Sequence, residues 1–157
     1  MNNINSDFNQ SFILNKDFYL NPSTYILVIN TVFKNSWQLI TDIKSFNEIN
    51  LYPFNFLPES INEPMLLIKD KNIKCISNVC THRAYLLINN LCMKKKIKCK
   101  YHGRTFNLDG TFKHAPGFEE AENFPTKNDN LIHYKLIQWN NFLFSGIDPK
   151  INIKPIL

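Results

Sequence analysis

The chain has 157 residues, a hydrophobic fraction of 44% and a charged fraction of 20%, which are ordinary values for a single globular domain. No run reaches the roughly 18 apolar residues of a membrane span, and the Asn-rich N-terminus lacks a secretion signal, so we expect a cytoplasmic protein with no membrane partner. The formal net charge of +5 could suggest a nucleic-acid partner, but the lysines are scattered except for the run 94–100.

The first predicted element is a helix near 22–35. Asn21 followed by Pro22 is typical of a helix start, with a capping residue and then proline at the first helical position. Apolar residues then recur at helical spacing, namely Tyr25, Ile26, Ile29, Val32, Phe33 and Trp37. The pattern predicts one amphipathic N-terminal α-helix whose aromatic stripe packs on the core.

From Trp37 onward, short apolar runs alternate with turn residues. The runs typical of strands are WQLITDI, LYPFNFL, PMLLIK, IKCISNV, IKCK, RTFNL, TFKH, LIHYKLI and NFLFSGI. Residues 70–72 and 109–110 are typical of hairpin turns, and residues 114–130 form a polar excursion. The pattern predicts an antiparallel all-β body after the helix, without an internal repeat or a second domain.

The stretch 80–103, CTHRAYLLINNLCMKKKIKCKYHG, contains candidate metal ligands. One residue separates Cys80 from His82, two separate Cys99 from His102, and sixteen lie between the pairs. Each short spacing places both side chains on the same side of a tight loop. If the residues between the pairs form a hairpin, the two loops lie side by side. In a reducing compartment, cysteines are ligands or free thiols more often than disulfides.

The spacing leaves three interpretations open. Zinc would accept two sulfurs and two nitrogens, although the familiar zinc finger places both cysteines before both histidines. Buried cysteines beside incidental histidines would require several coincidences of spacing. In a [2Fe-2S] cluster of the Rieske type, one iron binds two cysteines and the other binds two histidines.

The flanking residues resemble a known family. CTHRAYL and CKYHGRTFNLDGTFKHAPG are similar to the Rieske domain of the ring-hydroxylating, non-haem iron oxygenases. NPSTYILVINTVFKNSWQLI and PMLLIKDKNIKCISNVCTHR resemble the segments that precede the cluster in their large subunits. The resemblance covers nearly the whole chain and implies a Rieske-type β-sandwich with a small cluster-binding subdomain.

The resemblance also implies one [2Fe-2S] cluster per chain. Cys80 and Cys99 match the ligands of the inner iron, and His82 and His102 match the ligands of the outer, more exposed iron. We interpret the lysine run 94–100 as the solvated face of a β-hairpin and expect no nucleic-acid partner, while docking to an acidic redox partner stays open.

Other loop positions also match the family. Gly103 matches the glycine that allows the second loop to turn tightly, and Arg83 and Tyr101 match positions that cover the cluster and orient the loops. Two positions depart from the pattern, because Ala84 replaces a usual glycine and Arg104 replaces a usual tryptophan. The serine that follows the glycine in high-potential members is also absent at 104, which favours the low end of the range of roughly −150 to +300 mV.

The remaining cysteines and histidines have simpler interpretations. Cys75 and Cys92 fall on predicted strands and are expected to be small core residues. The positions of the loop disulfide of respiratory Rieske proteins correspond to two tyrosines, at 85 and 101, so that disulfide is not expected. An oxygenase also needs a mononuclear iron bound by two histidines and a carboxylate, and the spacing of His114 and His133 does not predict one here.

We expect an N-terminal extension with the helix over 1–36, a Rieske domain over 37–147 and a tail over 148–157, whose sequence INIKPIL suggests a truncated or split large subunit. Two functions stay open. The chain is either the electron-relaying part of an oxygenase large subunit, with the catalytic domain elsewhere, or a free-standing Rieske ferredoxin. The helix and the excursion favour the first. The expected partners are a ferredoxin or flavin reductase and, for the first function, an oxygenase catalytic domain or subunit.

Overall fold

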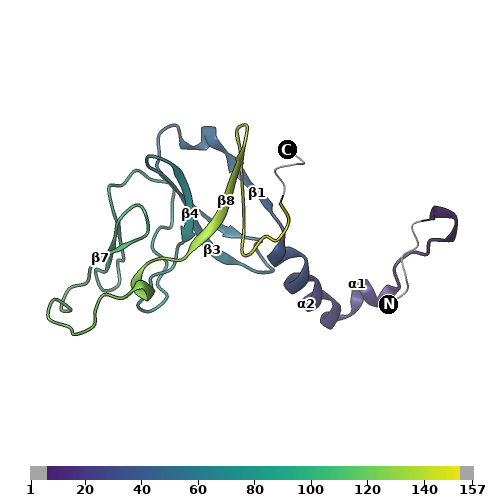
Figure 1. The fold of residues 1–157 in the computed structure, drawn as a ribbon, viewed down its shortest axis with the longest axis horizontal. Helices are drawn as coiled ribbons and strands as arrows, with labels where there is room; N and C mark the ends of the chain where they lie inside the picture. Colours follow the sequence, from purple (N-terminus) through teal and green to yellow (C-terminus); the bar gives the residue numbers. More distant parts are fainter. Residues whose placement is uncertain (1–6, 153–157) are drawn as a thin grey trace.

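The computed structural model describes residues 7–152 of the chain. Figure 1 shows two short helices that extend from one end of a body of antiparallel strands, with the small β7 region at the opposite end. The helical elements are η1 (Phe8–Gln10), α1 (Lys16–Leu20), α2 (Pro22–Thr31), η2 (Phe33–Asn35), η3 (Ile43–Phe46) and η4 (Lys127–Asp129). No helix within this part of the chain is long and apolar enough to cross a lipid bilayer.

The strands form two antiparallel sheets in the described residues, one with the order β1-β9-β8-β4-β3-β2 and one with the order β5-β6-β7. Their bounds are β1 Gln38–Asp42, β2 Leu51–Phe56, β3 Glu63–Lys69, β4 Ile73–Ser77, β5 Ile97–Lys98, β6 Thr105–Phe106, β7 Phe112–His114, β8 His133–Trp139 and β9 Phe142–Gly146. Every predicted strand is confirmed, as are the turns at 70–72 and 109–110. The antiparallel all-β class predicted from the sequence is therefore correct.

Strand β3 separates two hydrophobic cores. Its residues 65–68 are all fully buried, which requires packing on both faces because side chains alternate along a strand. Met65 and Leu67 belong to the core beside β9, whereas Leu66 and Ile68 belong to the core that also contains Cys80 and Cys99. The two candidate thiol ligands are thus part of a packed core at the end of the molecule that carries the small sheet.

The N-terminal helix is confirmed, with two corrections. Asn21 caps α2 by accepting a hydrogen bond from the Ser23 amide at 2.9 Å, but the α-helix ends at Thr31 and a 3-10 turn follows it. A second helix, α1, which the apolar pattern did not predict, begins after Asn15, whose side chain accepts from the Asp17 amide. The helical part of the extension therefore contains two α-helices.

The aromatic stripe of α2 does not pack on the core as predicted. Neither α1 nor α2 contains a buried residue, and Tyr25 and Ile26 are 53% and 58% exposed. Helical periodicity showed that these residues share a face, but it could not show what covers that face.

Only part of the predicted tail is described. The Ile151 side chain is exposed, and its backbone carbonyl accepts a hydrogen bond from Trp37 Nε1. Residues 153–157 lie outside the described part of the chain.

The predicted hairpin between the ligand pairs is also wrong. Residues 86–96 form no named strand, and β5 pairs with β6 instead. Asparagine side chains, instead of a neighbouring strand, form hydrogen bonds with the backbone of this segment. The buried Asn78 side chain donates to the Ile88 carbonyl at 2.7 Å and accepts from the Ile88 amide at 3.0 Å, and Asn50 bonds Lys94 in the same two-sided way. Side-chain amides can satisfy an irregular backbone because each has both a donor and an acceptor.

Candidate metal centre

The first candidate loop, residues 80–85, is closed by two backbone hydrogen bonds. The Cys80 amide donates to the Tyr85 carbonyl at 2.9 Å, and the Ala84 amide donates to the Cys80 carbonyl at 3.0 Å. Ala84 has a φ of 51°, which lies in the left-handed region that glycine favours. The structure thus gives a physical reason why a glycine is usual here and shows that this chain adopts the same turn with alanine.

The second loop, residues 99–104, repeats this pattern. The Cys99 amide donates to the Arg104 carbonyl at 2.8 Å, and the Gly103 amide donates to the Cys99 carbonyl at 3.1 Å. Gly103 has a φ of 77°, and a Cβ at this position would lie 3.1 Å from Pro116 Cγ. Both loops therefore begin at a cysteine and turn on a left-handed residue four positions later. The positive φ of Gly103 is one that glycine adopts without strain.

The two loops bring two cysteine and two histidine side chains to the same end of the molecule. Cys80 and Cys99 are 3% and 2% exposed and share one core, whereas the imidazoles of His82 and His102 are exposed, with ring centroids 4.9 Å apart. The donor set is thus divided into an inner pair of thiols and an outer pair of imidazoles. In residues 7–152, no three side chains of His, Cys, Asp or Glu are grouped so as to hold one metal ion. This arrangement fits a two-iron cluster with two protein ligands per iron better than a single tetrahedral zinc.

Local electrostatics differ between the two pairs. Burial raises the pKa of Cys80, and the neighbouring Cys99 side chain raises it further, so the thiol retains its proton unless a metal replaces it. Partial desolvation, followed by the positive charges of His102, Arg104 and Arg83, lowers the pKa of His82. A neutral imidazole is the form that binds a metal, so this shift favours ligation at neutral pH.

The flanking residues lie where they can restrict the histidines. The Tyr101 ring stacks on His102 with centroids 3.8 Å apart, and Tyr85 lies 5.8 Å from Tyr101. Phe118, in the excursion, approaches His82 edge-on at 6.3 Å. Arg83 is exposed, and its charge acts on His82. The polar excursion 114–130 thus contacts the first loop through Phe118 and approaches the second at Pro116.

Arg104 connects the two loops and forms a partly buried ion pair, which sequence reasoning missed. Arg104 Nη1 donates to Asp129 Oδ1 and to Thr81 Oγ1, each at 2.9 Å, and the guanidinium carbon lies 5.3 Å from the Phe112 ring centroid and 5.4 Å from that of Phe124. The other Asp129 oxygen accepts from the Thr126 amide in a capping box. The Thr-x-x-Asp pattern at 126–129 signals that cap, but nothing in the sequence joins it to Arg104.

The other candidate residues lie outside this arrangement. Cys75 is buried on β4, where burial raises its pKa to about 12, so its core role is confirmed. Cys92 is half-buried and forms an isolated bridge with Leu51 rather than lying on a strand. His114 Nε2 lies 4.0 Å from Glu119 Oε1, and His133 lies on β8 beside Gly110. All four cysteines are free thiols.

Fold and loops together define a cluster-binding β-domain, and a comparison with known families identifies it. Residues 36–125 match the description "Rieske [2Fe-2S] domain", and the chain belongs to that family. Membership implies that a [2Fe-2S] cluster is its cofactor, and the divided set of two thiols and two imidazoles fits this group.

Relatives of known function include carnitine and choline monooxygenases. The carnitine monooxygenase oxygenase subunit of Escherichia coli (strain K12) is 30% identical over 135 residues, which are 84% of this chain and 35% of the relative. The chloroplastic choline monooxygenase of Beta vulgaris is 28% identical over 137 residues, which are 86% of this chain and 30% of the relative. The chain thus spans about a third of the length of these relatives.

Solved structures share the fold. The apo form of the quaternary ammonium Rieske monooxygenase CntA superposes with a TM-score of 0.79 at 23% identity, covering 90% of this chain and 41% of that one. A naphthalene 1,2-dioxygenase with indole bound superposes with a TM-score of 0.70 at 16% identity, covering 82% of this chain and 29% of that one. The chain therefore shares the fold of these oxygenase structures over most of its length.

Proposed function

We propose that this chain is the electron-transfer part of a Rieske oxygenase and relays electrons to a mononuclear iron site that its described residues do not form. The observation that carries the proposal is the pair of matching loops, which present two buried thiols and two exposed imidazoles together. The carnitine and choline monooxygenase relatives support the oxygenase context.

In this proposal, each ligand pair binds one iron. Cys80 and Cys99 bind the inner iron as thiolates, and His82 and His102 bind the outer iron through neutral imidazoles. The inner pair is enclosed by the core, and the outer pair is exposed to solvent. We further propose 37–147 as the extent of the Rieske domain, with 1–36 as an extension and 148–157 as a tail.

The protein residues around the loops have separable tasks. When bound, the cluster supplies one-electron transfer at a potential within the Rieske range. The core around the thiols excludes water, while the exposed imidazole edges are where donor and acceptor can approach. Tyr101 limits the rotation of the His102 ring by stacking on it.

Arg104 joins the two loops, and its presence in place of a serine should affect the reduction potential of the cluster. Its Nη1 is engaged by Thr81 and Asp129, and its charge is offset by that carboxylate. A serine at this position would offer a hydroxyl to the cluster, and this chain lacks it. We therefore expect a potential toward the low end of the range of roughly −150 to +300 mV.

A free-standing electron carrier is the second candidate. Both loops and the segment that covers them belong to this chain, which is all that a carrier needs. The apolar residues of α1 and α2 favour the oxygenase part instead, because a free carrier would leave this surface in water.

An anaerobic reductive titration of the purified chain tests the proposed function. We expect uptake of about one electron per chain and full reoxidation by ferricyanide, because a Rieske cluster is a one-electron centre. We also expect no oxidation of carnitine or choline when a reductase and NADH are added. Substrate oxidation by this polypeptide without any further subunit would contradict the assignment.

A further inference from the structure

The segment that forms both ligand loops has an unbalanced charge. Between Asp70 and Asp109 the sequence contains no acidic residue, yet this segment holds half of the 18 lysines and arginines of the chain. Of these, Arg104 has a carboxylate partner in Asp129. The run 94–100 contributes five exposed lysines, and none of them forms an ion pair within residues 7–152. The surface beside the candidate metal centre is therefore strongly basic.

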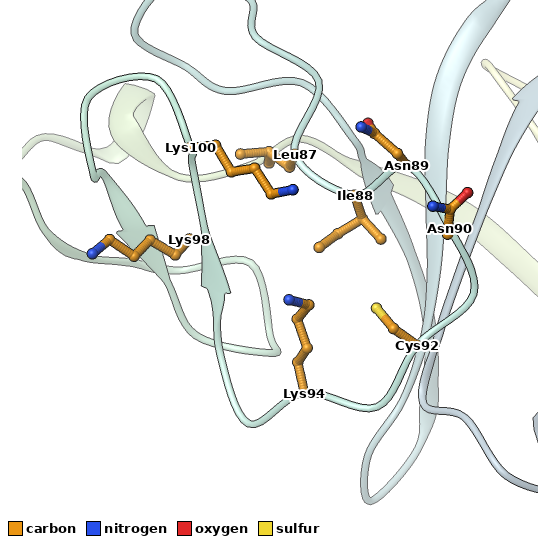
Figure 2. Close-up of a pocket in the computed structure, with 8 residues that line it drawn as sticks. All are labelled: Leu87, Ile88, Asn89, Asn90, Cys92, Lys94, Lys98 and Lys100. Atoms are coloured by element: carbon orange, nitrogen blue, oxygen red, sulfur yellow. The ribbon is translucent and has the colours of Figure 1, made fainter.

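A pocket of about 210 Å³ lies within this basic surface. Figure 2 shows the ammonium groups of Lys94 and Lys100 directed into it from opposite sides, with the Cys92 thiol at its border and Ile88 on its floor. The Lys98 side chain points away from the pocket in this view. No carboxylate lines the pocket, so two positive charges face the same small space without a compensating anion.

The pocket is adjacent to the second ligand loop. Lys98 and Lys100 flank Cys99 in the sequence, and Cys99 begins the loop that carries His102. Figure 1 places the small-sheet end of the molecule opposite the exposed helices, so a partner bound here does not compete with whatever covers α1 and α2. A protein anchored in the pocket would therefore lie against the loop side of the domain.

The shape of the basic surface distinguishes between kinds of polyanion. On the other side of Lys94, a second hollow is lined by Asp70 together with Lys95 and the apolar Met93 and Leu108. Asp70 thus places a negative charge beside Lys94 and Lys95, which does not favour a nucleic-acid backbone on that side. The single pocket between Lys94 and Lys100 suits a surface carboxylate of a folded protein, and complementary charge accelerates such encounters.

We propose that this lysine pocket anchors an acidic protein electron donor, with one donor carboxylate bound between Lys94 and Lys100. The donor loses one electron and the oxidised cluster gains it, while no covalent bond forms or breaks. This inference rests on the proposed function, because it specifies the partner of the same centre.

The experiment uses the cluster-loaded chain and a chemically reduced, acidic plant-type ferredoxin as the probe. Electron transfer from it to a Rieske cluster is downhill, because plant-type ferredoxins have lower reduction potentials than Rieske clusters. Stopped-flow mixing at several salt concentrations gives the second-order rate constant, and calorimetry with the oxidised ferredoxin measures binding without turnover. We expect the rate to fall steeply with added salt.

Two controls isolate the pocket. The double variant Lys94→Gln/Lys100→Gln should lose about tenfold in rate at low salt and lose the calorimetric signal. The matched variant Lys16→Gln/Lys44→Gln, which removes the same charge from two exposed lysines on α1 and η3, should stay within about twofold of the parent. A ferredoxin whose carboxylates are amidated should resemble the pocket variant in its rate.

The outcomes are separable. If the purified chain carries no cluster, the proposed function fails before the kinetics begin. If the cluster is present but the pocket variant or the amidated ferredoxin reacts like its parent, the docking inference is overturned and the proposed function is not. Tighter binding of a single-stranded oligonucleotide than of ferredoxin, lost in the same variant, would overturn it in favour of nucleic acid.

Discussion

Arg104 Nη1 donates a 2.9 Å hydrogen bond to Asp129 Oδ1, and this partly buried ion pair joins the second ligand loop to the end of the 114–130 excursion. The same nitrogen donates to Thr81 in the first loop at 2.9 Å. One guanidinium therefore holds three segments that are distant in sequence. Since each loop is short and is closed by its own two hydrogen bonds, the position of one loop relative to the other depends strongly on this contact.

Removing this guanidinium should destabilise the domain. Loss of the buried guanidinium leaves the partly exposed Asp129 carboxylate without its charged partner, and we expect Arg104→Met to lower the free energy of unfolding by about 1–3 kcal/mol. Urea denaturation of the apoprotein measures the change. The control Lys127→Met, an exposed neighbour of the same capping turn, should cost less than about 0.5 kcal/mol. Equal losses in both variants would show that the ion pair does not hold the loops.

Asp129 should make stability sensitive to acid. Burial alone would raise its pKa, but the hydrogen bonds from Thr126 and Arg104 outweigh that effect and hold the pKa below its usual value. A carboxylate with a lowered folded-state pKa stabilises the fold above the unfolded-state pKa of about 3.9 and loses this effect as pH falls through the folded value. The stability difference between the parent and Asp129→Asn should therefore be largest near neutral pH and shrink below about pH 4.

The measurement is the urea midpoint of both proteins across the acid range. The exposed Glu48→Gln variant serves as the control and should follow the parent curve at every pH. A gap between the parent and Asp129→Asn that stays constant down to the lowest pH would mean that the ionised form of this carboxylate is not favoured by the fold.

Glycine should be the better residue at position 84. Ala84 has a φ of 51°, and alanine in the left-handed region costs about 1–2 kcal/mol. Glycine removes this cost, but its greater conformational entropy in the unfolded state offsets part of the gain. We expect Ala84→Gly to raise the free energy of unfolding by about 0.5–1 kcal/mol. Ala121→Gly, at a position without a positive φ, should lower it instead. If both changes act in the same direction, the left-handed turn of the first loop is incorrect.

The opposite substitution, from glycine to alanine, can be made in the second loop. Gly103→Ala adds a Cβ at 3.1 Å from Pro116 Cγ to a residue with a φ of 77°. We expect a loss of about 1–3 kcal/mol, measured by the same urea unfolding, and faster loss of iron from the loaded protein. A stability equal to that of the parent would show that the two loops do not turn alike.

Sequence patterns predicted what depends on local spacing. The nine strands follow from short apolar runs between turn residues, and the two loops follow from paired ligands with flanking motifs. The five-residue helix α1 is too short to show a helical period. The segment 86–96 has the apolar residues of a strand, but Asn50 and Asn78 satisfy its backbone instead. The Arg104–Asp129 pair depends on tertiary structure, and no local rule connects the two residues.

The most direct test of the central claim is the EPR spectrum of the reduced, anaerobically purified chain, together with its iron and acid-labile sulfide content. The account predicts about two irons and two sulfides per chain and an average g value below about 2, the signature of a [2Fe-2S] cluster with mixed cysteine and histidine ligands. Exchange of Cys99 for serine or of His102 for alanine should abolish or alter this spectrum, whereas Cys92→Ser should leave it unchanged. Stoichiometric zinc without sulfide, or an unaltered spectrum after exchange of His102, would contradict the account.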